Sequence, residues 1–220
     1  MIPLRDSTPS QHFPLVTVTL ILVNLLVFLH QISLGPALEE FIYTYGLIPA
    51  NYTGLQQTTA GYLPFISSTF LHGSWMHVIG NMWVLWLFGD NVEDRMGRFR
   101  FLLFYLLCGL IAGITHTFIN PTSTIPVVGA SGAVAGIMGA YFLMFHRARV
   151  LTYIPPFFLL PLPAWLFLGF WALSQLWGGA VGLLQADGSN QIAFWAHIGG
   201  FLGGMILYRF FLNRQEEEYY

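Results

Sequence analysis

Residues 128–141, VGASGAVAGIMGAY, decide how this chain is expected to fold. The stretch is apolar, and apart from the closing tyrosine its only polar side chain is Ser131. Small residues recur at Gly132, Gly136 and Ala140, on one side of a helix, where they let two membrane helices pack backbone against backbone. The stretch therefore predicts a helix that is packed tightly inside a membrane and that carries a serine at its start.

The composition of the whole chain agrees with a membrane location. Of the 220 residues, 55% are hydrophobic and only 8% are charged, which is too few charges for a water-facing surface. Aromatic residues make up 17% and include seven tryptophans, as is typical of helix ends at lipid headgroups. The net charge of −2 argues against nucleic acid as a partner. The single cysteine, Cys108, lies in an apolar run and is expected to be a small buried residue.

Six apolar stretches are candidates for membrane-spanning helices, which need about 20 residues each, although the second and fifth are short. They are residues 13–32, 75–90, 99–118, 128–145, 163–178 and 192–211. Helices are expected because lipid offers no partner to an unpaired peptide group. The sequence thus predicts an all-α membrane protein, a bundle of six transmembrane helices in a single domain over residues 1–220.

The arginines predict the orientation of this bundle, because the chain contains no lysine. All eight fall before the first stretch, after the second, after the fourth, or at the end of the sixth. By the positive-inside rule both termini are expected in the cytoplasm, and the location is expected to be the plasma (inner) membrane. The long connection at residues 31–73 is rich in apolar residues and is expected to lie partly in the membrane interface, with a mobile solvated loop as the alternative.

Ser131 is a candidate nucleophile because a histidine is expected at a similar depth. Ser131 lies sixteen residues before Arg147, or roughly 24 Å from the cytoplasmic end of its helix at about 1.5 Å per residue. The same arithmetic from Arg209 places His197 about 18 Å from that end. A histidine within reach can take the proton of a serine, which is a weak nucleophile until a base activates it. The glycines expected to bring the two helices together are Gly132, Gly136, Gly200 and Gly204.

The second stretch carries two polar side chains, His77 and Asn81, on one face of its helix. Asp90 marks its inner end thirteen residues beyond His77, which again gives a depth of about 20 Å. Alone, such a pair more often joins helices by hydrogen bonds, but beside a serine and a base it has the donors that an oxyanion hole requires. No carboxylate is expected at this depth, so the sequence predicts a Ser131–His197 dyad.

With these features the chain resembles the rhomboid family of intramembrane serine proteases over nearly its whole length. The resemblance rests on His77-x-x-x-Asn81, on Gly129-Ala130-Ser131-Gly132 and on Ala196-His197-x-Gly199-Gly200. Further support comes from Gly89-x-x-x-Glu93-x-x-x-Gly97 after the second stretch. The resemblance implies a helical bundle with a water-filled cavity open to the outside, which cleaves peptide bonds in or near transmembrane segments of other proteins.

Carried over to this chain, the resemblance implies that Ser131 is the nucleophile and His197 the general base. It also implies that His77 and Asn81, with the backbone N–H of Ser131, would hold the oxyanion. Transmembrane protein substrates and membrane lipids are the expected partners, no cofactor or metal ion is expected, and no sequence feature defines an oligomeric state.

Two features depart from the family pattern. Many members carry an aromatic residue one turn after the serine, on which the histidine ring rests, whereas this chain has Ala135 there. Some members have a Trp-Arg pair in the first loop, and residues 31–73 contain neither residue type. The resemblance therefore does not predict what orients His197, or how residues 31–73 contact lipid or substrate.

Three other interpretations stay open. A rhomboid-like protein could bind membrane clients without cutting them, although such relatives typically lack the serine or the histidine. A transporter would also place polar residues at membrane depth, but no internal repeat is evident. A metal or haem site would use histidines expected toward the outer side, yet no HExxH string or nearby carboxylate accompanies them. Those histidines are His30, His72, His77, His116 and His197.

Overall fold

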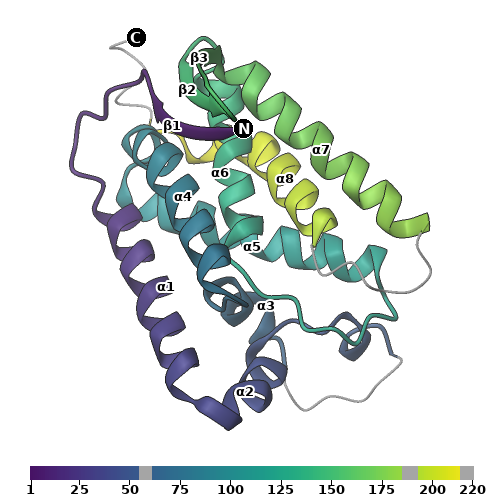
Figure 1. Cartoon of the computed structure of the whole chain (residues 1–220). Helices are drawn as coiled ribbons and strands as arrows, with labels where there is room; N and C mark the ends of the chain where they lie inside the picture. The colour runs from purple at the N-terminus through teal and green to yellow at the C-terminus, as the bar shows by residue number, and fades with distance from the viewer. Residues whose placement is uncertain (55–60, 185–192, 214–220) are drawn as a thin grey trace.

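The structure, a computed structural model, describes residues 1–54, 61–184 and 193–213, and most of these residues are helical (Figure 1). The long helices are α1 (Leu15–Ser33), α4 (Trp75–Met96), α5 (Arg98–Ile119), α6 (Ser131–Met144), α7 (Ala164–Leu184) and α8 (Phe194–Phe211). Helix α6 packs against α4, α5, α7 and α8, while α1 lies against α4 (Figure 1). The predicted helical bundle is thus confirmed.

Helix α6 is the centre of the bundle because it has no polar face. Every residue from Gly132 to Tyr141 is buried, as expected of a helix that is apolar all round. Helix α7 is different, since it buries Phe167 and Leu168 on one side while many of its large apolar side chains point outward: Leu173 is 60% exposed and Trp177 76%. Side chains of this kind are stable at a surface that faces lipid.

Among the described residues, three helical segments are long and apolar enough to cross a membrane: Leu15–Ser33, Arg98–Ile119 and Ala164–Leu183. Helix α6 is apolar but has only 14 residues, and α4 ends in a charged turn. These helices identify a multi-pass membrane protein. Crossing by all six long helices stays a prediction from the sequence.

Some helix bounds differ from those expected. Helix α6 starts at Ser131 because Gly129 has a φ of 132°, a conformation that ends helical geometry and that other residues rarely adopt. Helix α4 continues to Met96, beyond its apolar part, and α7 continues to Leu184. The extension of α4 is stabilised by contacts of its charged turn with the segment that precedes α1.

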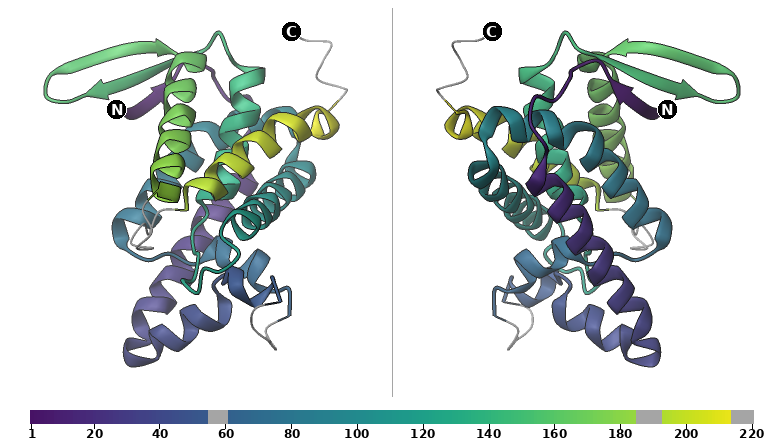
Figure 2. Two further views of the ribbon diagram at one scale, coloured as in Figure 1. Left: turned by 90° about the vertical axis from the view of Figure 1, so that its right-hand side faces the viewer. Right: turned by 90° about the vertical axis from the view of Figure 1, so that its left-hand side faces the viewer.

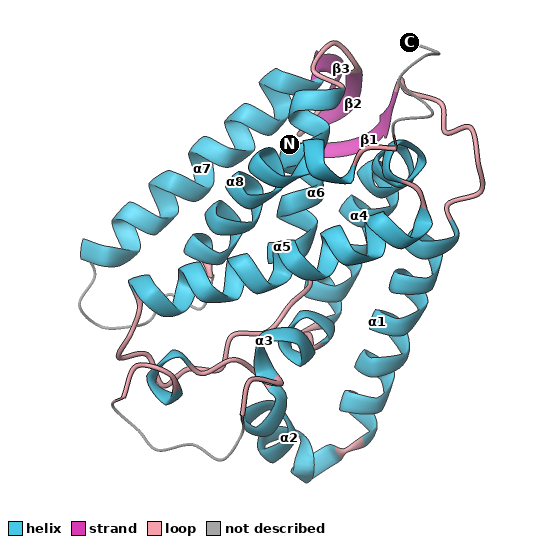
Figure 3. Ribbon diagram, turned by 180° about the vertical axis from the view of Figure 1, so that it is seen from behind, coloured by secondary structure: helices cyan, strands magenta, loops and turns pink. Residues whose placement is uncertain are grey.

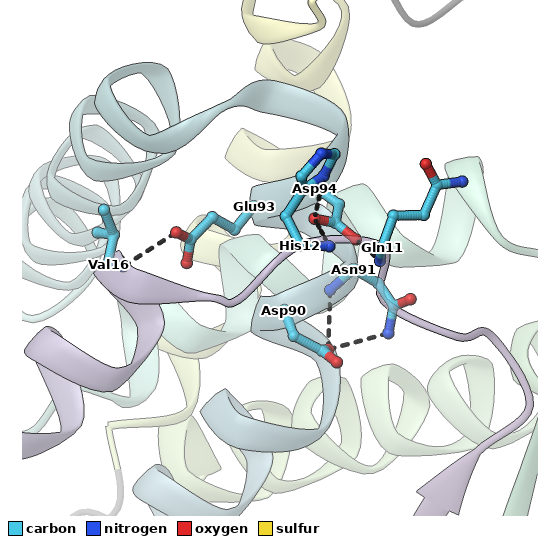
Figure 4. A network of polar contacts seen from close by, with 7 residues as sticks. All are labelled: Gln11, His12, Val16, Asp90, Asn91, Glu93 and Asp94. Carbon is cyan, nitrogen blue, oxygen red and sulfur yellow. Dashed lines mark hydrogen bonds and ion pairs between the residues drawn. The ribbon is translucent and has the colours of Figure 1, made fainter. Parts of the chain in front are cut away.

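Glu93 in that charged turn caps the start of α1 (Figure 4). Its buried carboxylate accepts hydrogen bonds from the backbone N–H groups of Val16 and Thr17 at 2.9 and 2.8 Å, and from the Thr17 hydroxyl at 2.8 Å. A carboxylate at a helix N-terminus satisfies unpaired N–H groups and meets the positive end of the helix dipole. One turn earlier, a side chain at Gly89 would crowd Thr17. The Gly89-to-Gly97 motif therefore joins α4 to α1.

A three-stranded antiparallel sheet, absent from the sequence prediction, lies at one end of the bundle (Figure 3). Strand β1 (Ile2–Asp6) pairs with β2 (Arg149–Ile154), which forms a hairpin with β3 (Phe158–Pro163). The Trp83 indole donates a hydrogen bond to the Pro3 carbonyl at 2.7 Å and so ties β1 to α4. We call this end of the bundle the sheet end.

The connection between α1 and α4 folds into short helices at the opposite end, which we call the loop end (Figure 2). They are η1 (Gly35–Ala37), α2 (Leu38–Tyr45), η2 (Pro49–Asn51), α3 (Pro64–Ser67) and η3 (Ser68–Phe70). Leu47 and Val127 exchange two backbone hydrogen bonds, and the N–H of Gly129 donates to the Ser68 carbonyl. The connection therefore fixes the segment that leads into α6.

Candidate active site

Ser131 is the first residue of α6 but does not cap it. The N-cap position is Ala130, and no side chain caps this helix start. The Ser131 Oγ instead lies 2.8 Å from Nε2 of His197 on α8, which is a hydrogen-bonding distance. The two candidate residues, 66 positions apart in the chain, are thus in contact at the N-terminus of a buried helix.

Glycines allow this contact because they let α6 and α8 meet without intervening side chains. A Cβ atom at Gly200 would collide with the carbonyl of Gly132, and one at Gly204 with the carbonyl of Gly136. On another side of α6, a Cβ at Gly136 would collide with Cys108 of α5. The four glycines that the sequence singled out all lie at these close approaches, and buried Cys108 packs there as a small side chain.

The second ring nitrogen of His197 also has a partner, which the sequence did not identify. Its Nδ1 lies 2.7 Å from Oε1 of Gln175 on α7. The indole of Trp171, one turn before Gln175, lies 6.0 Å from the imidazole between ring centroids, at an interplanar angle of 36°. An aromatic side chain from α7 therefore lies beside the histidine, whereas Ala135 of α6 leaves no ring on that helix.

His77 lies against the loop that precedes Ser131. A Cβ atom at Gly129 would stand 2.6 Å from Nε2 of His77, so the ring and the positive φ both require glycine at that position. Asn81 lies one turn further along α4, is 8% exposed, and its Nδ2 has no hydrogen-bond partner among the described residues. A buried amide without a partner is costly, and a ligand that accepts a hydrogen bond would relieve that cost.

His72 precedes α4 and packs beside His77, with 5.1 Å between ring centroids. Its backbone exchanges two hydrogen bonds with the Gln31 side chain of α1. Burial, and secondarily the neighbouring His77, lowers the pKa of His72 to about 4, so this ring is neutral at physiological pH.

Two of the histidines expected toward one side of the membrane lie outside the contacts described so far. His30 packs beside Phe41 of α2, and His116 is buried in α5. Within the part of the chain that the structure describes, no group of three or more His, Cys, Asp or Glu residues is placed to hold a metal ion.

Comparison with known proteins shows to which family the chain belongs. The model of the Rhomboid domain family matches residues 59–214. Rhomboid protein 1, mitochondrial, of Saccharomyces cerevisiae is 28% identical over 187 residues, which cover 83% of this chain and 49% of the yeast protein. The chloroplastic rhomboid-like protein 11 of Arabidopsis thaliana is 32% identical over 118 residues, 54% of this chain and 38% of the plant protein.

The match to a bacterial relative covers most of the length of that relative. YdcA of Bacillus subtilis, provisionally named a rhomboid protease, is 25% identical over 194 residues, which cover 83% of this chain and 89% of the relative. The chain spans about half or less of the yeast and plant relatives. Because the family match covers more than half of the chain, the protein belongs to the rhomboid family, whose members are generally intramembrane serine proteases that act on membrane proteins.

Proposed function

We propose that this protein is an intramembrane serine endopeptidase in which Ser131 is the nucleophile and His197 the general base. The observation that carries the proposal is the 2.8 Å contact between Ser131 Oγ and His197 Nε2 at the start of a buried helix. A serine in a merely structural role at this position would be expected to cap the helix, and Ser131 does not.

The reaction follows from this geometry. Nε2 of His197 takes the hydroxyl proton of Ser131 as Oγ attacks the scissile carbonyl, which gives a tetrahedral intermediate with a negative oxygen. The protonated imidazole then gives its proton to the leaving amine, and the C–N bond breaks to leave an acyl-enzyme. Water, deprotonated by the same histidine, attacks the ester; its collapse releases the carboxylic acid product and returns the proton to Oγ.

Three donors would stabilise the negative oxygen. The backbone N–H of Ser131 lies at the helix start, where N–H groups without intrahelical partners and the helix dipole favour negative charge. His77 lies against Gly129, two residues before Ser131, and the buried Nδ2 of Asn81 is unpartnered among the described residues. Donors prepositioned in a site with little water lose no energy to reorganisation when the charge develops.

Transmembrane segments of other proteins are the proposed substrates. A peptide bond in an ordered helix has its carbonyl hydrogen-bonded and its backbone shielded, so attack requires local unwinding. We therefore expect preferred cleavage near Gly, Pro or small polar residues at the outer end of a span. Replacing such residues by leucine in a cleaved substrate should slow the cut.

The proposed location is the plasma (inner) membrane, with both termini and the sheet end of the bundle in the cytoplasm. The arginines support this orientation, while the yeast and plant relatives are mitochondrial and chloroplastic proteins. In a Cys108→Ala background, Thr122→Cys should react with an impermeant thiol reagent added outside intact cells, and Arg98→Cys should not. The opposite pattern would reverse the orientation.

The decisive test compares wild type with Ser131→Ala in liposomes that contain single-span substrates. Wild type should cleave and should react with a fluorophosphonate probe, whereas Ser131→Ala should do neither. His197→Ala should label poorly because the hydroxyl is no longer activated. Equal labelling of wild type and Ser131→Ala would exclude the proposed nucleophile.

A further inference from the structure

Gln175 is a polar residue on α7, a helix with many exposed apolar side chains. It is half-buried, while its neighbours Leu173 and Leu176 are 60% and 45% exposed. Its Oε1 lies 2.7 Å from Nδ1 of His197, on the side of the ring opposite Ser131. A glutamine in lipid-facing surroundings needs a hydrogen-bond partner, and here that partner is the candidate base.

The neighbouring hydrogen bonds fix which way the Gln175 amide points. Its Nε2 donates to Oγ of Ser174 at 3.0 Å, and the Ser174 hydroxyl donates to the carbonyl of Trp171 at 2.6 Å. The amide oxygen is left to face His197, and an oxygen can only accept. Nδ1 of His197 must therefore carry the proton, so Nε2 presents its lone pair to the Ser131 hydroxyl.

We infer that Gln175 is a positioning residue, which holds His197 in the tautomer and ring orientation that let Nε2 act as base. This inference rests on the proposed function. The arrangement is then Ser–His–Gln, with an amide in the place that a carboxylate occupies in many serine proteases and an asparagine in papain-like enzymes. A neutral amide serves this role without burying a negative charge at membrane depth.

Substitutions at Gln175 separate positioning from packing. Gln175→Leu leaves the His197 Nδ1–H without an acceptor, so kcat should fall about tenfold to a hundredfold with KM changed by less than about twofold. Gln175→Glu keeps an acceptor and adds charge that stabilises the protonated imidazole, so the acidic limb of the pH–kcat profile should move to higher pH. Leu173→Ala, on the exposed side of α7, is the matched control and should keep the wild-type profile.

The histidine tautomer gives a readout that does not depend on activity. In protein labelled with ¹⁵N-histidine, His197 should show a protonated Nδ1 in wild type and Gln175→Glu, and a shift toward the other tautomer in Gln175→Leu. If Ser131→Ala still cleaves, the proposed function fails whatever Gln175 does. If Ser131→Ala is inactive while Gln175→Leu keeps its kcat and tautomer, only the positioning role is wrong. Should Gln175→Leu not fold, an unmoved acidic limb in Gln175→Glu would overturn the role.

A second inference concerns the β2–β3 hairpin, which reaches sideways beyond α7 (Figure 2). Residues 155–162, PPFFLLPL, contain no polar side chain, and Phe157 at the turn is 87% exposed. Strand β3 leads directly into α7, whose exposed Trp165 and Phe170 continue the same apolar surface. Arg147 and Arg149 stand at the base of the hairpin, as suits contact with anionic headgroups.

The geometry points to a membrane-docking hairpin, whose tip inserts among the lipids of the leaflet at the sheet end. An apolar tip of this kind is stable in the acyl region and costly in water. The proposal does not depend on catalysis. An environment-sensitive fluorophore on Phe157→Cys, in a Cys108→Ala background in phosphatidylglycerol-containing liposomes, should be quenched by doxyl-labelled lipid and protected from iodide. The matched control Pro9→Cys, exposed on the N-terminal segment, should behave in the opposite way. Quenching of the Phe157 site by iodide and not by doxyl lipid would overturn the proposal.

Discussion

Polar side chains at the two ends of α6 differ in how completely they are hydrogen-bonded. At the loop end, the one hydrogen-bond partner of the Ser131 Oγ among the described residues is His197, and the buried Asn81 amide nitrogen on α4 lacks such a partner. At the sheet end, the Tyr141 hydroxyl donates to Asp6 and lies 3.3 Å from the Thr8 hydroxyl. Asp6 also accepts from Nδ2 of Asn91 at 3.1 Å.

We propose that this difference separates polar groups with a structural role from polar groups with a catalytic role. Buried polar groups that satisfy one another stabilise the fold, whereas groups left unsatisfied keep their hydrogen-bonding capacity for a ligand. Substitutions at the loop end should therefore change turnover more than stability. Substitutions at the sheet end should change stability more than turnover.

The largest effect is expected where α6 and α8 touch between the two ends. Gly200→Leu places a branched side chain against the Gly132 carbonyl, so the helices must separate and the Ser131–His197 contact with them. Cleavage and probe labelling should both be lost. The matched control is Gly169→Leu on α7, where an added Cβ meets open space and activity should persist. An active Gly200→Leu protein would show that the close glycine contact is not needed.

The next effect concerns the loop end alone. Asn81→Ala should lower kcat about a hundredfold to a thousandfold, because one donor to the developing oxyanion is removed, while KM changes little. Its melting temperature should stay close to that of wild type, since the amide nitrogen has no described hydrogen bond to lose. His77→Ala tests the other side-chain donor in the same assay. Normal kcat in a folded Asn81→Ala protein would make Asn81 a structural residue.

At the sheet end, Glu93→Gln should show the converse pattern. The carboxylate accepts three hydrogen bonds at the start of α1, and an amide NH₂ group cannot accept one of them. We expect a loss of about 2 kcal/mol and a melting temperature lower by about 5 °C, with kcat unchanged at temperatures where the protein is folded. A kcat that falls with unchanged stability would contradict the division between the two ends.

The smallest effect is a pH dependence at Asp6. Burial raises the pKa of Asp6 above its ordinary 3.8, although the Tyr141 hydrogen bond opposes this shift, so the folded state favours the protonated acid. The resulting destabilisation is absent below the ordinary pKa, grows between that value and the raised one, and is complete above the raised pKa. Asp6→Asn can keep the hydrogen bonds from Tyr141 and Asn91, because both reach the same carboxylate oxygen, although an amide NH₂ group cannot accept those from Thr8 and the Asp6 backbone. The melting temperature of Asp6→Asn relative to wild type should therefore rise as the pH is raised from 4 to 7, and a difference that does not change with pH would contradict this role of Asp6.

The helical bundle could be predicted from the sequence because the signals for a helix lie within short stretches of the chain. Apolar runs of suitable length mark the helices, and the four-residue spacing of glycines predicted the face that α6 turns to α8. The distances of Ser131 and His197 from the cytoplasmic ends of their helices, as calculated from the sequence, differed by about 6 Å. The structure places the two side chains in contact.

The sheet and Gln175 were missed for different reasons. Strand β1 pairs with residues nearly 150 positions away, and no local pattern reports such a pairing. Gln175 did carry a signal, since Ser174 and Gln175 interrupt the apolar run of α7 about 16 Å from its start at Ala164. This distance is close to the distance of about 18 Å calculated for His197 from the cytoplasmic end of its own helix. Because a carboxylate is the usual third member of a serine protease triad, a neutral glutamine does not stand out in the sequence as a partner for the histidine.

The pairing of β1 with β2 also sets an order for the synthesis of the chain. Residues 2–6 are synthesised before α1, but their partner strand is made only after α1, α4, α5 and α6. A nascent chain that ends before Arg149 therefore has no strand to which β1 can bind. Because chains fold as they are made, β1 reaches its final place only after α1, α4, α5 and α6 have been synthesised.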